Sequence, residues 1–169
     1  MRTNMRSALA ALTLAIFGAA ASTQALAEGD YLLATASTGG TYYPVGVALS
    51  TLVKVKLQPK DKINMSAINS AGSGENIKLL RENETQFAIL QGLYGAYAWN
   101  GTGPIEQDGP QKDLRSVTML WQNVEHFTVT AEAAKTGTIE DVRALNSVAG
   151  FGKKNSGSLG SSRTLLGNL

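Results

Sequence analysis

The chain has 169 residues, of which 15 are basic and 13 are acidic, and it contains no cysteine. The absence of cysteine excludes disulfides, thiolate metal sites and a cysteine nucleophile. The basic residues are scattered and do not form one stripe with aromatic residues between them, which argues against a nucleic-acid partner.

The first 27 residues have the pattern of a secretory signal peptide. Arg2 and Arg6 precede an apolar run at residues 8–21, and Ala25-Leu26-Ala27 forms a small-x-small cleavage site. This run is too short to span a membrane, and no later segment reaches about 18 apolar residues. We therefore expect export to the periplasm, cleavage after residue 27, and a mature chain that does not itself span the membrane.

A strand, a tight loop and a helix are predicted directly after the cleavage site. The apolar run at residues 31–36 stops before Gly39-Gly40, and a helical pattern covers residues 42–55. Pro44 suits the first turn of this helix, because its missing N–H would have no intrahelical partner there.

The glycines before this helix are candidates for an anion-binding loop. Thr38 or Thr41 can cap the helix through a side-chain oxygen. The backbone N–H groups at a helix start carry the positive end of the helix dipole, and glycine lets a carboxylate or phosphate approach them. The alternative is an ordinary strand-to-helix turn, which a lone Gly-Gly pair indicates more often.

Strands and helices continue to alternate along the chain. Period-two patterns or short apolar runs predict strands at residues 63–68, 87–90, 115–121, 125–130 and 147–152. Helical spacing predicts helices at residues 75–81, 93–99 and 159–166, and a capping pattern predicts another helix start at Thr138. Loops are expected at residues 57–62, 69–74, 100–110 and 153–158.

This alternation predicts a mainly parallel sheet in an α/β fold. The strand-to-helix loops of such a sheet meet at its carboxyl edge, where open α/β folds bind ligands. Three loops with hydroxyl groups and glycines lie in residues 28–125, and a fourth lies in residues 126–169. We expect two lobes, with a boundary near residues 125–131 and a cleft lined by neutral donors.

Four short motifs occur in the order found in one family of receptors. They are Thr38–Gly46 (TGGTYYPVG), Ser70–Asn76 (SAGSGEN), Phe87–Gln91 (FAILQ), and Gly152 with Ser156-Gly157-Ser158. They resemble the motifs of the TAXI family, the solute-binding receptors of tripartite ATP-independent periplasmic (TRAP) transporters. Gly92-Leu93 departs from this pattern, because an acidic residue commonly follows the glutamine, and Ser158 replaces a threonine.

The resemblance implies a type II periplasmic-binding-protein fold, in which two α/β lobes close on a small organic acid or an amino acid such as glutamate. Such a receptor delivers its ligand to a sodium-driven TRAP permease and uses neither catalysis nor a cofactor. Loop position and resemblance together predict the ligand-binding residues Thr38, Gly39, Gly40, Thr41, Tyr42, Ser70, Ser73, Gln91, Ser156, Gly157 and Ser158.

An alternative function is that of a periplasmic serine hydrolase. The sequence Ser156-Gly157-Ser158-Leu159-Gly160 nearly forms a G-x-S-x-G nucleophile elbow around Ser158. It begins with serine, however, and no histidine follows it in the chain to act as the base. The single histidine, His126, cannot form a metal site by itself, so we expect no metal.

The resemblance covers only the first half of a two-lobed receptor. Residues 126–169 supply one strand-helix unit, which is too little for a second lobe. We therefore expect the sequence to be a fragment, truncated in the second lobe.

Overall fold

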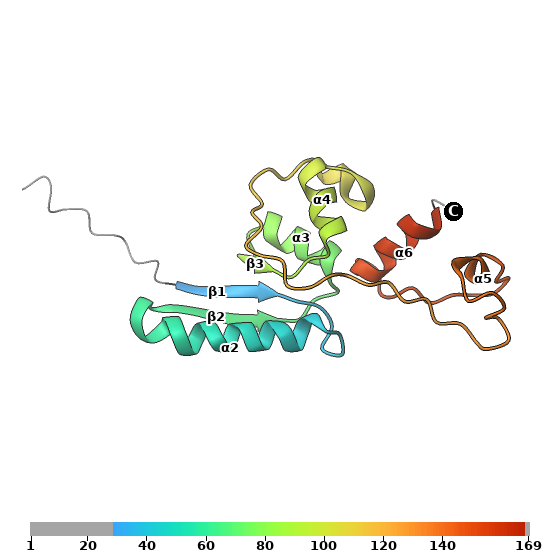
Figure 1. Ribbon diagram of the computed structural model, residues 1–169. Coiled ribbons are helices and arrows are strands. Elements are labelled where there is room, and N and C mark those ends of the chain that lie inside the picture. Colours follow the sequence, from blue (N-terminus) through green and yellow to red (C-terminus); the bar gives the residue numbers. More distant parts are fainter. Residues whose placement is uncertain (1–28, 168–169) are drawn as a thin grey trace, which may run out of the picture.

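The computed structural model describes residues 29–167, and the predicted signal peptide lies outside these residues (Figure 1). Its centre is a three-stranded sheet made of β1 (Gly29–Ala34), β2 (Ile63–Ile68) and β3 (Phe87–Ala88). The strand order is β2-β1-β3, and both strand pairs are parallel. The sequence prediction of a parallel α/β sheet is therefore confirmed for this part of the chain.

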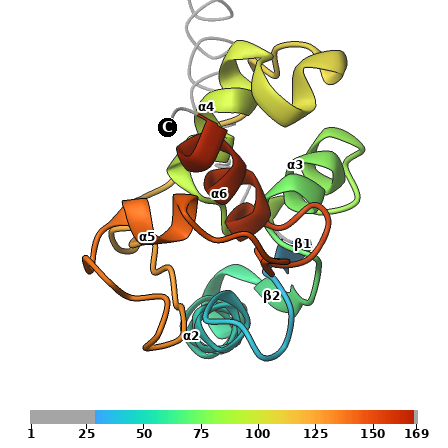
Figure 2. The same cartoon turned by 90° about the vertical axis from the view of Figure 1, so that its right-hand side faces the viewer.

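Helices cover both faces of the sheet. Helix α2 (Tyr42–Asp61) lies along one face, and α3 (Ser73–Arg81) and α4 (Gly92–Asn100) lie on the other (Figures 1 and 2). Helix α2 contains residues 57–61, which were expected to be loop. Most of these residues are exposed, so polar side chains are tolerated on the last turn of the helix. The helix ends only where Lys62 adopts a left-handed conformation with φ 55°.

The main apolar core lies between α3, α4 and the 3₁₀ helix η1 (Gly103–Asp108), which occupies part of a predicted loop. It contains the buried side chains Ile77, Tyr94, Ala98 and Ile105. Arg81 at the end of α3 forms an ion pair with Asp108 of η1, with 2.5 Å between Nη1 and Oδ2. This pair attaches the segment after α4 to α3, and we call the sheet together with α2, α3, α4 and η1 the sheet domain.

The strands predicted at residues 115–121, 125–130 and 147–152 are not formed. Residues 125–130 do show the predicted alternation, because Glu125, Phe127 and Val129 are half-buried and the residues between them are exposed. A period-two pattern describes burial only, whereas a strand also needs a neighbouring chain to satisfy its backbone groups. Within residues 29–167 these segments have no such neighbour.

Two helices follow in the last part of the described chain. Helix α5 (Ile139–Arg143) is short, and α6 (Gly157–Gly167) begins two residues before the predicted stripe. The predicted cap at Thr138 is confirmed, since its hydroxyl oxygen accepts a hydrogen bond from the backbone N–H of Glu140. None of the helices in residues 29–167 has the length and apolar character needed to cross a membrane.

Candidate functional site

Asn76 holds together the carboxyl ends of two strands. Its side chain is fully buried in the first turns of α3, and its Nδ2 donates to Thr35 O at 2.7 Å and to Ile89 O at 2.9 Å. Thr35 and Ile89 directly follow β1 and β3. One amide therefore fixes the edge of the sheet from which the candidate site is built.

Ser70 belongs to the same hydrogen-bond network. Its hydroxyl lies 2.6 Å from Asn76 Oδ1 and accepts from the backbone N–H of Gly72 at 3.0 Å. It also lies 3.2 Å from Thr35 O. This buried hydroxyl, predicted as a ligand contact, is occupied by contacts within the protein that shape the loop before α3.

Ser73, Gln91 and Gly157 meet at the carboxyl edge, although they come from three separate loops. The hydroxyl of Ser73 accepts a hydrogen bond from the backbone N–H of Gln91 at 3.0 Å. A Cβ atom on Gly157 would lie 2.6 Å from Gln91 Oε1 and 2.9 Å from Ser73 Oγ. The backbone of Gly157 therefore packs directly against these two side chains. Predicted site residues from residues 28–125 and from residues 126–169 come together here.

The amino-terminal end of α6 sits against the amino-terminal end of α3. The backbone N–H of Gly74 donates to Asn155 O at 3.0 Å, and Gly72 approaches Ser156 closely. Ser156 caps α6, because its Oγ accepts from Leu159 N at 3.1 Å. The positive ends of two helix dipoles therefore lie side by side.

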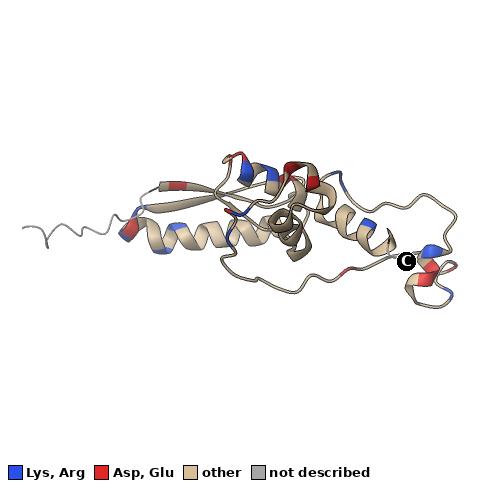
Figure 3. Ribbon diagram, turned by 90° about the horizontal axis from the view of Figure 1, so that it is seen from above, with Lys and Arg blue, Asp and Glu red and all other residues tan. Residues whose placement is uncertain are grey.

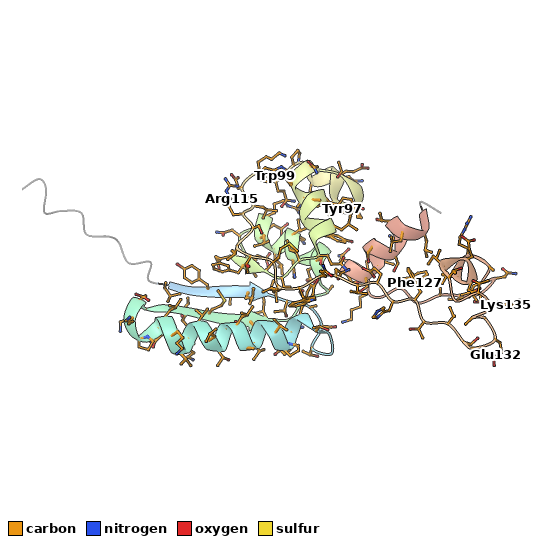
Figure 4. All side chains as sticks on the ribbon, viewed as in Figure 1. Tyr97, Trp99, Arg115, Phe127, Glu132 and Lys135 are labelled. Atoms are coloured by element: carbon orange, nitrogen blue, oxygen red, sulfur yellow. The ribbon has the colours of Figure 1, made fainter. Side chains whose placement is uncertain are left out.

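Helix α6 also rests on two tyrosines of α4. Gly160 lies against the Tyr94 hydroxyl so closely that any side chain there would overlap it. One turn further along, Thr164 Oγ1 lies 2.8 Å from the Tyr97 hydroxyl (Figure 4). Burial raises the pKa of Tyr94, as does Tyr97, while Arg163 on α6 lowers it.

The segment from Trp121 to Glu125 contributes three residues that sequence analysis did not assign to the site. Trp121 packs edge-on against Tyr42, with ring centroids 5.8 Å apart. Asn123 Oδ1 and Glu125 Oε1 each lie 3.4 Å from Gln91 Nε2. The position of Glu125 at the predicted lobe boundary was the one available signal, because a chain that crosses between lobes passes the cleft.

Tyr42 connects this segment to the loop of Ser73. Burial raises the pKa of the Tyr42 hydroxyl, the Ser73 hydroxyl lowers it, and the negative charge of Glu125 raises it. The net direction is upward, so Tyr42 is a neutral hydrogen-bonding group at neutral pH. Glu125 is thus the only formally charged member of the cluster formed by Tyr42, Ser73, Gln91, Asn123 and Glu125.

The glycine loop directly precedes Tyr42 but, within the described residues, forms no hydrogen bond to the other members of this cluster. Thr38, Gly39 and Thr41 are exposed, and the backbone N–H of Gly40 is used in a turn to Ser37 O at 2.8 Å. The prediction that Thr38 or Thr41 caps α2 is wrong, because within the described residues neither side chain accepts from the first turn. Thr41 is itself in a helical conformation, whereas a capping residue is normally extended.

Two cavities adjoin the cluster. The larger has a volume of about 870 Å³ and lies between residues 124–130, residues 147–152 and α6. Phe127, labelled in Figure 4, and Phe151 line it. Of the predicted ligand contacts, only the exposed Ser158 lines it. The smaller, of about 240 Å³, is lined by Gln91, Asn123, Glu125 and residues of α6.

Comparison with known protein families gives a match that begins in β1 and continues through α6. Residues 33–169 match the NMT1-like family. The chain belongs to the NMT1-like family. Its domains are periplasmic-binding-protein-like and bind substrates without transforming them. The α/β fold with its small parallel sheet is compatible with such a domain.

In this NMT1-like chain Ser158 does not have the surroundings of an activated nucleophile. Ser158 and His126 line the same larger cavity, but no hydrogen bond joins them within residues 29–167. Ser158 lies in the first turn of α6 and not on a strand-to-helix elbow after a strand, because residues 147–152 form none. The geometry supports ligand contact better than nucleophilic attack.

Charged residues of both signs are mixed along the elements of the NMT1-like chain. Acidic and basic side chains share α3 and α5, with no stripe of one sign along either helix (Figure 3). No group of three or more residues of metal-binding type is found in the described part of the chain.

Proposed function

We propose that this chain is the ligand-binding first part of a periplasmic solute receptor of the TAXI class, which captures a small carboxylate or amino acid and passes it to a TRAP permease. The observation that carries the proposal is the meeting of Ser73, Gln91 and Gly157 where α3 and α6 begin. These residues come from three of the four resembling motifs and lie within contact distance of one another.

The chemistry of this junction suits a carboxylate. Two helix amino-terminal ends lie side by side, and each carries the positive end of a helix dipole. The N–H groups of Gly74 and Leu159 donate to Asn155 O and Ser156 Oγ, which leaves the other N–H groups of the first turns for a ligand. Neutral donors of this kind bind anions without a basic residue, as helix starts commonly do. The Ser73 and Tyr42 hydroxyls add donors at the same edge.

The proposal includes export of the chain to the periplasm, because residues 1–27 have the pattern of a signal peptide. A receptor that collects solute outside the cytoplasmic membrane requires a permease to carry it inward, and the motif resemblance names a TRAP permease as that partner. The two-lobed type II fold belongs to the same proposal.

Isothermal titration calorimetry of the exported chain with L-glutamate tests the proposal. We expect binding, and we expect Ser73→Ala to weaken it about tenfold, because one hydrogen bond to a charged group contributes roughly 1.5 kcal/mol or more. Ser116→Ala is the matched control, since Ser116 is exposed and, within the described residues, forms no hydrogen bond with the cluster. Equal affinities in Ser73→Ala and the wild type would remove the α3 start from the site.

A serine hydrolase using Ser158 remains the second candidate, because Ser158 and His126 share the larger cavity. Turnover of a p-nitrophenyl ester that Ser158→Ala abolishes would favour it. We expect no turnover above that of the Ser158→Ala variant.

A further inference from the structure

We propose that the backbone carbonyl of Asn155 competes with the ligand for the start of α3. It holds the start of α6 against α3, and a ligand must displace it in order to bind between the two helices. This inference rests on the proposed receptor function and adds an inhibitory contact within the chain to the same site.

The first turn of α3 already donates to an acceptor that the chain itself supplies. The backbone N–H of Gly74 donates to Asn155 O at 3.0 Å. The N–H groups at a helix start are the ones that a bound carboxylate uses, because they have no partner within the helix. Asn155 O therefore occupies a donor that an anionic ligand would need.

The junction leaves no room for a ligand between its two sides. A Cβ atom on Gly157 would lie 2.6 Å from Gln91 Oε1 and 2.9 Å from Ser73 Oγ. A Cβ atom on Gly74 would likewise lie 2.9 Å from Asn155 O. The two helix starts are thus in direct contact, whereas a carboxylate that bridges them needs about 2.7–2.9 Å to its donors on each side. A ligand that contacts both Ser73 and Gly157 therefore requires the start of α6 to move away from α3.

This docked arrangement, in which Asn155 O contacts Gly74, is costly in two places. Asn155 is an asparagine with a left-handed backbone, φ 65°, which side chains disfavour. Gln91 supplies the second cost, because its side chain is only 7% exposed and its Oε1 has no donor within the described residues. Gly157 lies against that oxygen. Both costs are relieved when the start of α6 moves away, so a ligand can open the junction.

The backbone of Asn155 offers a way to shift this equilibrium without altering a buried contact. Its side chain is exposed, and the bond from Ser156 N to Lys153 O, at 3.1 Å, closes a turn with Asn155 in its third position. Valine resists a positive φ at that position, whereas glycine accepts it. The apparent affinity of a ligand falls with the fraction of molecules that are closed to it. Asn155→Val should therefore strengthen binding, and Asn155→Gly should not.

Calorimetry with L-glutamate as the probe tests the inference. We expect Asn155→Val to bind about three- to tenfold more tightly than the wild type, because a left-handed conformation is unfavourable by roughly that factor or more. Asn83→Val is the matched control. Asn83 is also an exposed asparagine with a left-handed backbone, φ 57°, but it follows the carboxyl end of α3, opposite the junction. It should lower the melting temperature and leave the affinity unchanged.

Amide hydrogen exchange at Gly74 gives a second readout that needs no ligand. The Gly74 N–H should exchange faster in Asn155→Val than in the wild type, Asn155→Gly or Asn83→Val, and circular dichroism melts should show each variant folded. Exchange at the same rate in all four proteins would overturn the inference.

The binding results separate the inference from the proposed function. Weaker or equal binding by Asn155→Val, with tight binding by the wild type, would overturn the competition and leave a carboxylate receptor standing. Binding by Asn155→Val alone would support both. Absence of L-glutamate binding by every variant would refute the proposed function and this inference with it.

Discussion

Replacing Asn76 by alanine should destabilise the sheet domain more than any other single amide substitution in it. The change removes two donated hydrogen bonds, to Thr35 O and Ile89 O, and one bond accepted from the Ser70 hydroxyl. All three partners lie at the carboxyl edge of the sheet, so the strand ends lose the group that joins them.

The magnitude follows from the number of bonds and their burial. A buried neutral hydrogen bond contributes about 0.5–1.5 kcal/mol net, and three of them give roughly 2–4 kcal/mol. A small domain has about 5–15 kcal/mol of stability in total, so the loss is a large part of it. Asn76→Asp should be at least as damaging at neutral pH, because an oxygen would then face two carbonyl oxygens.

Urea denaturation followed by tryptophan fluorescence and far-ultraviolet circular dichroism measures the effect. Asn100→Ala is the control, since Asn100 is exposed at the end of α4, and it should change the free energy of unfolding by no more than about 0.5 kcal/mol. A loss below about 1 kcal/mol in Asn76→Ala would refute the view that this amide holds the edge of the sheet.

Three further predictions concern close packing and pH. Gly157→Ala should speed proteolysis at the start of α6, since a Cβ would lie 2.6 Å from Gln91 Oε1, whereas Gly167→Ala, with open space around it, should not. Gly46→Ala should lower stability by about 1–3 kcal/mol because its Cβ would overlap the Thr35 side chain; a stability like that of the wild type would show that α2 can shift without cost. Burial raises the pKa of Asp141, but hydrogen bonds from the loop before α5 outweigh it and hold the pKa below its ordinary value. The stabilisation by Asp141 is therefore present above the ordinary aspartate pKa and lost as pH falls through the lower folded value, so acid unfolding of Asp141→Asn should depend less on pH, and an unchanged acid profile would contradict this.

The sheet domain could be predicted from the sequence because its signals are local. Residues 63–68 alternate with period two, and residues 75–81 have a helical apolar stripe, so β2 and α3 formed where expected. The loop glycines and serines also indicated which edge of the sheet would collect polar groups. These patterns depend on neighbours a few residues apart, and the fold preserves them.

The strands predicted after residue 110 failed for a physical reason. Alternation at residues 125–130 records which side chains are shielded, but pairing depends on another segment that lies far away in the chain. The caps predicted at Thr38 and Thr41 failed similarly, because cap geometry depends on backbone angles that Gly39-Gly40 leave open.

The composition of the cluster could not be foreseen in full. Asn76 and Ser70 are polar residues near a loop. Only the assembled sheet shows that both are buried and that the Ser70 hydroxyl donates a hydrogen bond to Asn76. Glu125 reaches Gln91 across a separation of 34 residues, and nothing local in the sequence marks that contact. The role of Tyr42 also required the position of Trp121, which belongs to a segment without regular structure.

The surface beneath α6 has a consequence for how easily that helix can leave its place. Ser156, Gly160 and Thr164 meet the hydroxyls of Tyr94 and Tyr97. The buried residues of α6 are all small: Gly157, Gly160, Ser161 and Ser162. Separating these surfaces would expose peptide and hydroxyl groups, which water hydrates about as well as the protein does. The position of α6 therefore depends on closeness of fit more than on hydrophobic free energy. A bound molecule that contributes only about 1–3 kcal/mol across the junction is enough to decide whether the helix stays seated.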